Sequence, residues 1–160
     1  MNNDITFERN ENVFNYRVAI VIKNNNKVLI QKDTRAKHIT LPGGRCEIGE
    51  SSADTAIREF LEETGIETES IKGLGMIENF FVSSFTGKKY HEILLIQELN
   101  FKNSDEYKKN VINNIEEKKK DFLTYEWLEI DKLKENNFKP EIVIDIINQN
   151  NFIHYVNKEY

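Results

Sequence analysis

Apolar residues occupy every second position between residues 14 and 22, as Phe14, Tyr16, Val18, Ile20 and Ile22. Alternation with a period of two is typical of a strand that buries one face. Three asparagines follow at positions 24–26, and they predict a turn because asparagine tolerates positive φ. The apolar segment 27–31 then predicts a returning strand, so we expect the two segments to form a hairpin.

Further strand-like segments follow in the second half of the chain. Residues 66–84 and 90–99 predict a second hairpin, with a bend near Gly73 and Gly75. Residues 122–130 predict the last strand. The polar residues 1–12 predict an edge segment or a frayed terminus.

The clearest helical pattern lies between residues 51 and 65. Apolar residues recur there at the spacing i, i+3, i+4, i+7 and i+8, as Ala53, Ala56, Ile57, Phe60 and Leu61. Ser51 and Asp54 resemble a capping box, and Gly65 is a natural C-terminal stop. A closing helix is expected over 141–148 after Pro140, and part of 105–118 is also expected to be helical. The fold class is therefore α+β or α/β.

The first helix carries Glu59, Glu62 and Glu63 on a side different from its apolar stripe. Like charges at this spacing repel each other, and acids near a helix C-terminus oppose the macrodipole by roughly 0.3–1 kcal/mol each. A solvated helix face would be the default interpretation of an arbitrary acidic triplet. Here the unfavourable placement indicates a positive partner, most simply a metal ion.

Composition and charge narrow the class of protein. The chain has 160 residues, the size of one ordinary domain, and we expect a single domain over 1–160. A net charge of −5 argues against binding duplex nucleic acid, and an acidic protein that acts on phosphates would need a cation. Neither a secretory signal nor a segment long enough to span a membrane is apparent, so a soluble cytoplasmic protein is expected.

A motif frames the acidic helix. Gly44, Glu50 and the segment 58–66 (REFLEETGI) stand at the spacing of the Nudix box, and the chain resembles the MutT-type Nudix hydrolases in this stretch. Phe60 is the one departure, where a bulky aliphatic residue is usual. The resemblance implies a Nudix-type α/β/α sandwich with a mixed central sheet. It also implies Mg²⁺-dependent hydrolysis of a pyrophosphate bond in a nucleoside diphosphate-linked compound, with Mn²⁺ as a substitute metal.

The resemblance also implies roles for residues of the box. Glu59, Glu62 and Glu63 match the metal-binding, catalytic glutamates, and the backbone carbonyl of Gly43 matches a further metal ligand. Glu50 and Arg58 match a structural salt bridge. The base that activates water would be Glu59 or a residue of a distant loop. The candidates outside the box are Glu116 and Glu117 and, less favoured, Glu126.

Substrate contacts are less constrained by the sequence. Arg35 and Arg45 flank the box and suit phosphate, although surface placement fits them equally well. Phe80 and Tyr90 could stack on a base, although aromatic residues in strands more often pack in the core. The substrate is expected to be a small nucleotide-like diphosphate.

Two questions stay open at this stage. The absence of a proline about fifteen residues beyond the box weakly favours a nucleoside triphosphate or an unassigned diphosphate over ADP-ribose. A non-catalytic nucleotide-binding or sensor domain on the same fold is the alternative function, although such members typically lose glutamates of the box. A homo-oligomer is possible because relatives commonly dimerise, but no sequence feature indicates one.

Overall fold

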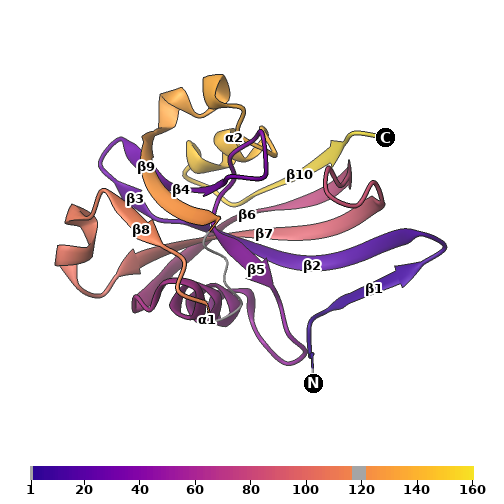
Figure 1. The fold of residues 1–160 in the computed structure, drawn as a ribbon, viewed down its shortest axis with the longest axis horizontal. Coiled ribbons are helices and arrows are strands. Elements are labelled where there is room, and N and C mark those ends of the chain that lie inside the picture. The colour runs from indigo at the N-terminus through magenta and orange to yellow at the C-terminus, as the bar shows by residue number, and fades with distance from the viewer. Residues whose placement is uncertain (1, 117–121) are drawn as a thin grey trace.

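The computed structural model describes residues 2–116 and 122–160, which form two β-sheets and two α-helices (Figure 1). The larger sheet has the strand order β1-β2-β7-β6-β10, with β5 paired to β2, and it is mixed because the β2–β7 and β6–β10 pairs are parallel. Its strands are β1 Thr6–Arg9, β2 Asn12–Val21, β5 Gly43–Arg45, β6 Thr68–Val82, β7 Lys89–Phe101 and β10 Ile153–Lys158. The smaller sheet has the order β3-β4-β9-β8, with bounds β3 Lys23–Asn24, β4 Lys27–Asp33, β8 Val111–Asn113 and β9 Leu123–Glu129.

The two helices lie on opposite faces of the larger sheet. Helix α1 (Ser52–Thr64) packs through Ala56 and Phe60 on Val18 and Ile20 of β2. Helix α2 (Val143–Ile147) packs with Ile77 of β6 and Leu94 of β7 on the other face. Figure 1 shows the sheet between the two helices. This arrangement confirms the predicted sandwich with a mixed central sheet.

The prediction of a simple hairpin from segments 14–22 and 27–31 is wrong. Strand β2 pairs with β1, β5 and β7 in the larger sheet, whereas β4 pairs with β3 and β9 in the smaller one. The direct backbone contact of β4 with the preceding segment is limited to the two-residue β3 and to a hydrogen bond from the Leu29 N–H to the Ile22 carbonyl. Both faces of the end of β2 and of the apolar part of β4 are buried, so alternation alone does not identify their partners.

Three further boundaries differ from expectation. The described part of segment 105–118 is not an α-helix. It contains a 3₁₀ helix (Ser104–Lys108) and then β8, and Ile112 of β8 is buried in the same core cluster as Phe60 of α1. Residues 117 and 118 lie outside the described part. The closing helix begins at Val143, three residues after Pro140, because the backbone between them forms i→i+3 turns. Strand β10 was not anticipated.

The remaining connections are short. Two 3₁₀ helices, Ile130–Lys132 and Lys134–Asn136, link β9 to the turn before α2. For residues 1–12 the sequence predicted either an edge segment or a frayed terminus, and β1 is an edge strand. Among the described residues, no helix combines the length and the apolar character that crossing a membrane requires.

Candidate active site

Helix α1 begins and ends where the sequence predicts. The Ser51 hydroxyl accepts a hydrogen bond from the backbone N–H of Asp54 at 3.1 Å, and Gly65 takes the left-handed conformation (φ 73°) that ends the helix. Phe60 is fully buried, whereas Leu61 is 42% exposed and does not belong to the buried stripe. The helix is therefore held by a narrower apolar face than its sequence suggests.

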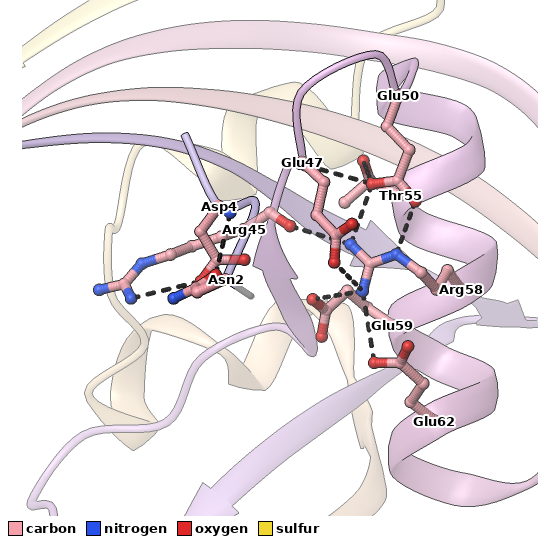
Figure 2. A network of polar contacts seen from close by, with 9 residues as sticks. All are labelled: Asn2, Asp4, Arg45, Glu47, Glu50, Thr55, Arg58, Glu59 and Glu62. Carbon is pink, nitrogen blue, oxygen red and sulfur yellow. Dashed lines mark hydrogen bonds and ion pairs between the residues drawn. The ribbon is translucent and has the colours of Figure 1, made fainter. Parts of the chain in front are cut away.

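Arg58 is the centre of a polar network at the start of the site (Figure 2). Its guanidinium donates to both carboxylate oxygens of Glu50, from Nε at 2.6 Å and from Nη2 at 2.9 Å. Nη1 donates to Glu59 at 3.0 Å and to Glu62 at 3.3 Å, and Nη2 donates to the backbone carbonyl of Arg45 at 3.1 Å. Arg58 thus ties the loop before the helix to the helix itself.

The same network shifts the ionisation of its members. The hydrogen bonds from Arg58 lower the pKa of Glu50 to about 2, with smaller contributions from Thr55 and the Glu47 backbone. Burial raises the pKa of Glu59, against the lowering effect of Arg58. A carboxylate held partly out of water in this way gains more from a bound cation than a solvated one does.

Three carboxylates from two segments converge. Oxygen atoms of Glu59, Glu62 and Glu116 all lie within 4.8 Å of one another, a spacing that could hold a metal ion; we refer to them as the acid cluster. Glu116 reaches α1 because the preceding residue, Ile115, donates its backbone N–H to the carbonyl of Glu63 at 2.8 Å. Of the candidates outside the box, Glu116 is therefore near the predicted metal ligands.

The other two candidates are placed differently. Glu117 lies outside the described residues. Glu126 is on β9 and forms an ion pair with Lys32 at 2.6 Å, apart from the acid cluster. The geometry thus places Glu116, and not Glu126, beside the predicted metal ligands, and the role of Glu117 stays a prediction.

Glu63 lies on the core side of the helix rather than in the acid cluster. Its side chain is 5% exposed, and Oε2 accepts a hydrogen bond from the Tyr125 hydroxyl at 2.8 Å. The Asn114 amide donates in turn to the Tyr125 oxygen at 3.1 Å. This buried chain of hydrogen bonds joins the end of α1 to β9 and to the segment that carries Glu116.

The two glycines of β5 allow close packing on both sides. A Cβ atom on Gly44 would lie 2.0 Å from Cδ of Glu59, and one on Gly43 would lie 2.1 Å from the Val18 carbonyl oxygen. Glu59 can therefore occupy its position only because residue 44 has no side chain. The predicted role of the Gly43 carbonyl as a metal ligand stays a prediction.

A pocket of about 550 Å³ lies on the other face of β5, and Gly43 and Arg45 contribute to its lining. Arg17 of β2 also lines it, directly opposite Arg45 in the β2–β5 pairing. Like charges directly opposite on neighbouring strands destabilise each other, and although Asp4 pairs with Arg45 at 3.7 Å, a further anion beside Arg17 would be favoured. Sequence reasoning missed Arg17, although an arginine directly before the apolar end of the strand was a usable signal.

The other predicted substrate contacts divide between the two faces of the sheet. Tyr90 lines the pocket and stacks on Phe81, with 5.0 Å between ring centroids. Phe80 points to the opposite face, where it stacks on His91 at 4.4 Å. Arg35 pairs with Asp33 at 2.8 Å and lies over the Phe122 ring. Asp33 lines the pocket, whereas Arg35 does not.

Comparison with known proteins agrees with the resemblance found in the sequence. The family model described as "NUDIX domain" matches residues 13–145. The chain is 43% identical over 53 residues to "Putative mutator protein MutT4" of Mycobacterium tuberculosis. The aligned residues are 33% of this chain and 21% of that protein. It is 33% identical over 77 residues to "Putative 8-oxo-dGTP diphosphatase" of Bacillus subtilis, covering 43% and 52%. The chain thus spans between about a fifth and about a half of these relatives.

Solved structures agree on the fold. A NUDIX hydrolase from Nitrosomonas europaea superposes with a TM-score of 0.61 at 18% identity, covering 90% of this chain and 79% of that one. A MutT protein from Bacillus halodurans gives 0.59 at 19% identity, covering 89% and 90%. With the family model extending over most of the residues that build the sheets, α1 and the pocket, the chain belongs to the NUDIX family.

Proposed function

We propose that this protein is a pyrophosphohydrolase that cleaves a pyrophosphate bond in a nucleoside diphosphate-linked compound, with Mg²⁺ as its metal. The observation that carries the proposal is the convergence of Glu59, Glu62 and Glu116 beside a strand whose other face opens onto a pocket with two arginines. Acids in this number would repel an anionic substrate unless a cation lay between them. The arginines supply the complementary anion site.

The donor set fits a hard divalent cation. Carboxylate oxygens from Glu59, Glu62 and Glu116 are the ligands that Mg²⁺ prefers, and Mn²⁺ accepts the same set. Bound there, the metal would neutralise phosphate charge and polarise the phosphorus centre. Glu63 would support this group through its buried contact with Tyr125, and we propose a direct ligand role for Glu63 only on rearrangement of that contact.

The protein's own residues would position the substrate. Arg17 and Arg45 would hold phosphate oxygens, while Arg58 keeps Glu59 and Glu62 oriented through its own hydrogen bonds. Strand β5 is an edge strand, so a substrate in the pocket could extend past it towards the acid cluster. Glu116 and Glu59 are our candidates for the base that takes a proton from the attacking water.

A nucleoside triphosphate is the substrate type we favour. One relative carries a name that specifies diphosphatase action on 8-oxo-dGTP, and another is named as a mutator protein of the MutT type. A non-catalytic nucleotide-binding domain is the second candidate. The intact box and the acid cluster favour the enzyme, because pure binding does not require three clustered carboxylates.

A substrate panel tests the proposal. The full chain is incubated with nucleoside triphosphates and other nucleoside diphosphate derivatives, with Mg²⁺ and then with excess chelator, and release of phosphate and pyrophosphate is measured. We expect metal-dependent turnover that Glu62→Gln lowers by at least about tenfold. The matched control is Glu106→Gln, a glutamate within the 3₁₀ helix Ser104–Lys108 after β7, which should retain full activity. Binding without turnover of any compound would support the second candidate instead.

A further inference from the structure

A row of polar side chains crosses the floor of the pocket. In the sheet register, Asn15 of β2 is paired with Glu92 of β7, and Glu92 is paired with Asn79 of β6. Asn79 is paired in turn with Asn157 of β10. Asn15, Glu92 and Asn79 are 2%, 5% and 5% exposed, and all three line the pocket. A polar row this deeply buried in a sheet is costly unless its groups are hydrogen-bonded.

The two asparagines are fixed by their neighbours. Asn15 Oδ1 accepts from the Thr6 hydroxyl at 2.7 Å and from Arg45 Nε at 3.2 Å. Asn79 Oδ1 accepts from Asn157 Nδ2 at 2.8 Å. The amide oxygens of both residues are therefore engaged, and what they leave for a ligand is N–H donors.

Glu92 is supplied with far fewer partners. Within residues 2–116 and 122–160, the hydrogen bond that its carboxylate accepts comes from Asn79 Nδ2 at 3.4 Å, near the limit of useful length. A carboxylate offers about four acceptor sites, so a buried one with a single long hydrogen bond has capacity for additional donors. Since Glu92 lines the pocket, a bound molecule is positioned to supply them.

The surroundings of Glu92 define the shape of that molecule. Two residues further along the strands in one direction, Phe81 and Tyr90 form a stacked aromatic wall of the pocket. Two residues in the other direction lies Arg17, about 7 Å along β2 from Asn15, the residue paired with Glu92. The pocket thus offers a flat apolar wall, then a buried acceptor, then a cationic end, which matches a planar heterocycle linked to phosphate.

We propose that Glu92 is a specificity-determining residue that binds a nucleobase presenting two adjacent N–H donors on one edge, as guanine does. The carboxylate accepts both hydrogen bonds side by side, in the way that it accepts a bidentate guanidinium. Adenine presents an amino group beside a ring nitrogen that is an acceptor, and the lone pair of that nitrogen repels the carboxylate. This inference rests on the proposed function, because it assigns the moiety that enters the same pocket.

Binding of nucleoside monophosphates tests the inference separately from catalysis, because these compounds hold no pyrophosphate bond. Affinities of the full chain for GMP, IMP and AMP are measured by isothermal titration calorimetry. IMP differs from GMP only in lacking the 2-amino group, so one of the two hydrogen bonds is lost. We expect GMP to bind at least about tenfold more tightly than IMP and AMP.

Variants then assign the preference to one residue. Glu92→Gln should reduce the affinity for GMP to about that for IMP, because the amide replaces one acceptor by a donor. The matched control is Glu78→Gln, on the neighbouring strand, where Glu78 faces away from the pocket and contacts His154. This variant should keep the preference for GMP.

The outcomes separate the two proposals. Equal affinities for GMP and IMP in the wild-type chain, a preference that persists in Glu92→Gln, or no binding of GMP would overturn the role of Glu92. If Glu92→Gln does not fold, the wild-type chain still gives a decisive result, because equal affinities for GMP and IMP would overturn the role of Glu92. Failure of metal-dependent hydrolysis in the substrate panel would count against the proposed function and leave a GMP preference standing.

Discussion

The carboxylate of Glu59 lies against the backbone of Gly44, so closely that a Cβ atom on Gly44 would be 2.0 Å from Cδ of Glu59. A methyl group on residue 44 would displace Glu59, because the pairing of Gly44 with Val18 fixes the backbone at this position. Arg58 contacts Glu59 as well, so the displacement also disturbs the guanidinium. The glycine thus sets the position of a proposed metal ligand.

Gly44→Ala should therefore lower metal-dependent hydrolysis by about a hundredfold or more, since misplacement of a catalytic group by 1 Å costs about that much. The measurement is kcat/KM at saturating Mg²⁺. Gly73→Ala is the control, because a Cβ there would meet the Phe152 ring at an ordinary 3.5 Å. Equal activity of the two variants would show that Gly44 does not position Glu59.

The Glu50–Arg58 pair predicts a pH-dependent contribution to stability. Arg58 lowers the pKa of Glu50 from 4.5 to about 2, so the ionised pair stabilises the folded state above pH 4.5 and loses this effect as the pH falls towards 2. Because both side chains are partly exposed, we expect Glu50→Gln to lower the free energy of unfolding by about 2 kcal/mol at pH 7.

Urea denaturation of both proteins between pH 7 and pH 3 measures this difference. It should stay level above pH 4.5 and shrink below it. Glu8→Gln, which breaks an exposed ion pair with Lys88, serves as the control and should change stability little. A difference between wild type and Glu50→Gln that is independent of pH would contradict the assignment.

The Tyr125–Glu63 hydrogen bond predicts a different kind of destabilisation. Tyr125→Phe removes the donor to a buried carboxylate and the acceptor for Asn114, so both groups lose a partner. We expect a loss of about 1–3 kcal/mol, seen as a fall in Tm of several degrees. Tyr155→Phe, at a partly buried ring of the other core cluster, is the control. An unchanged Tm in Tyr125→Phe would mean that this hydrogen bond contributes nothing.

The sequence predicted those parts of the molecule that depend on local pattern. Helix α1, with its Ser51 cap and Gly65 stop, follows from residues close in the chain, as does the Glu50–Arg58 pair eight residues apart. The helical spacing already places Glu63 on the buried side of α1, seven residues after Ala56 and three after Phe60, but its partner Tyr125, 62 residues away in the chain, did not follow from it. The sequence named Glu116 beside Glu117 and the less favoured Glu126, and only the contact between Ile115 and Glu63 places Glu116 near the end of α1.

The pocket was beyond the reach of local pattern for the same reason. Phe80 and Phe81 are neighbours of the same residue type, so the sequence does not say which of them faces the pocket. The pairing of β6 with β7 places Phe81 on the same face as Tyr90. The polar row through Asn15, Glu92 and Asn79 comes from three strands whose register cannot be read from any one of them. Long-range pairing therefore determines the binding face, whereas the box supplies two of the three members of the acid cluster, Glu59 and Glu62.

Arg17 lies between these two regions, and it carries the last prediction. It lines the pocket and stands opposite Arg45, and its charge reaches Glu59, where burial raises the pKa of the carboxyl and Arg17 opposes that rise. A guanidinium in this place would bind a phosphate oxygen of the substrate in both the ground state and the transition state. Arg17→Met keeps most of the apolar stem and removes the charge, so KM should rise by about tenfold or more while kcat changes less.

Steady-state kinetics with the best substrate of the panel measure both constants, with Arg9→Met on the exposed edge strand β1 as the control. Arg17→Lys should recover part of the loss, because a lysine restores the charge without the bidentate geometry. If Arg17→Met lowered kcat and left KM unchanged, Arg17 would act on the transition state alone. The paired arginines would then serve catalysis rather than substrate binding.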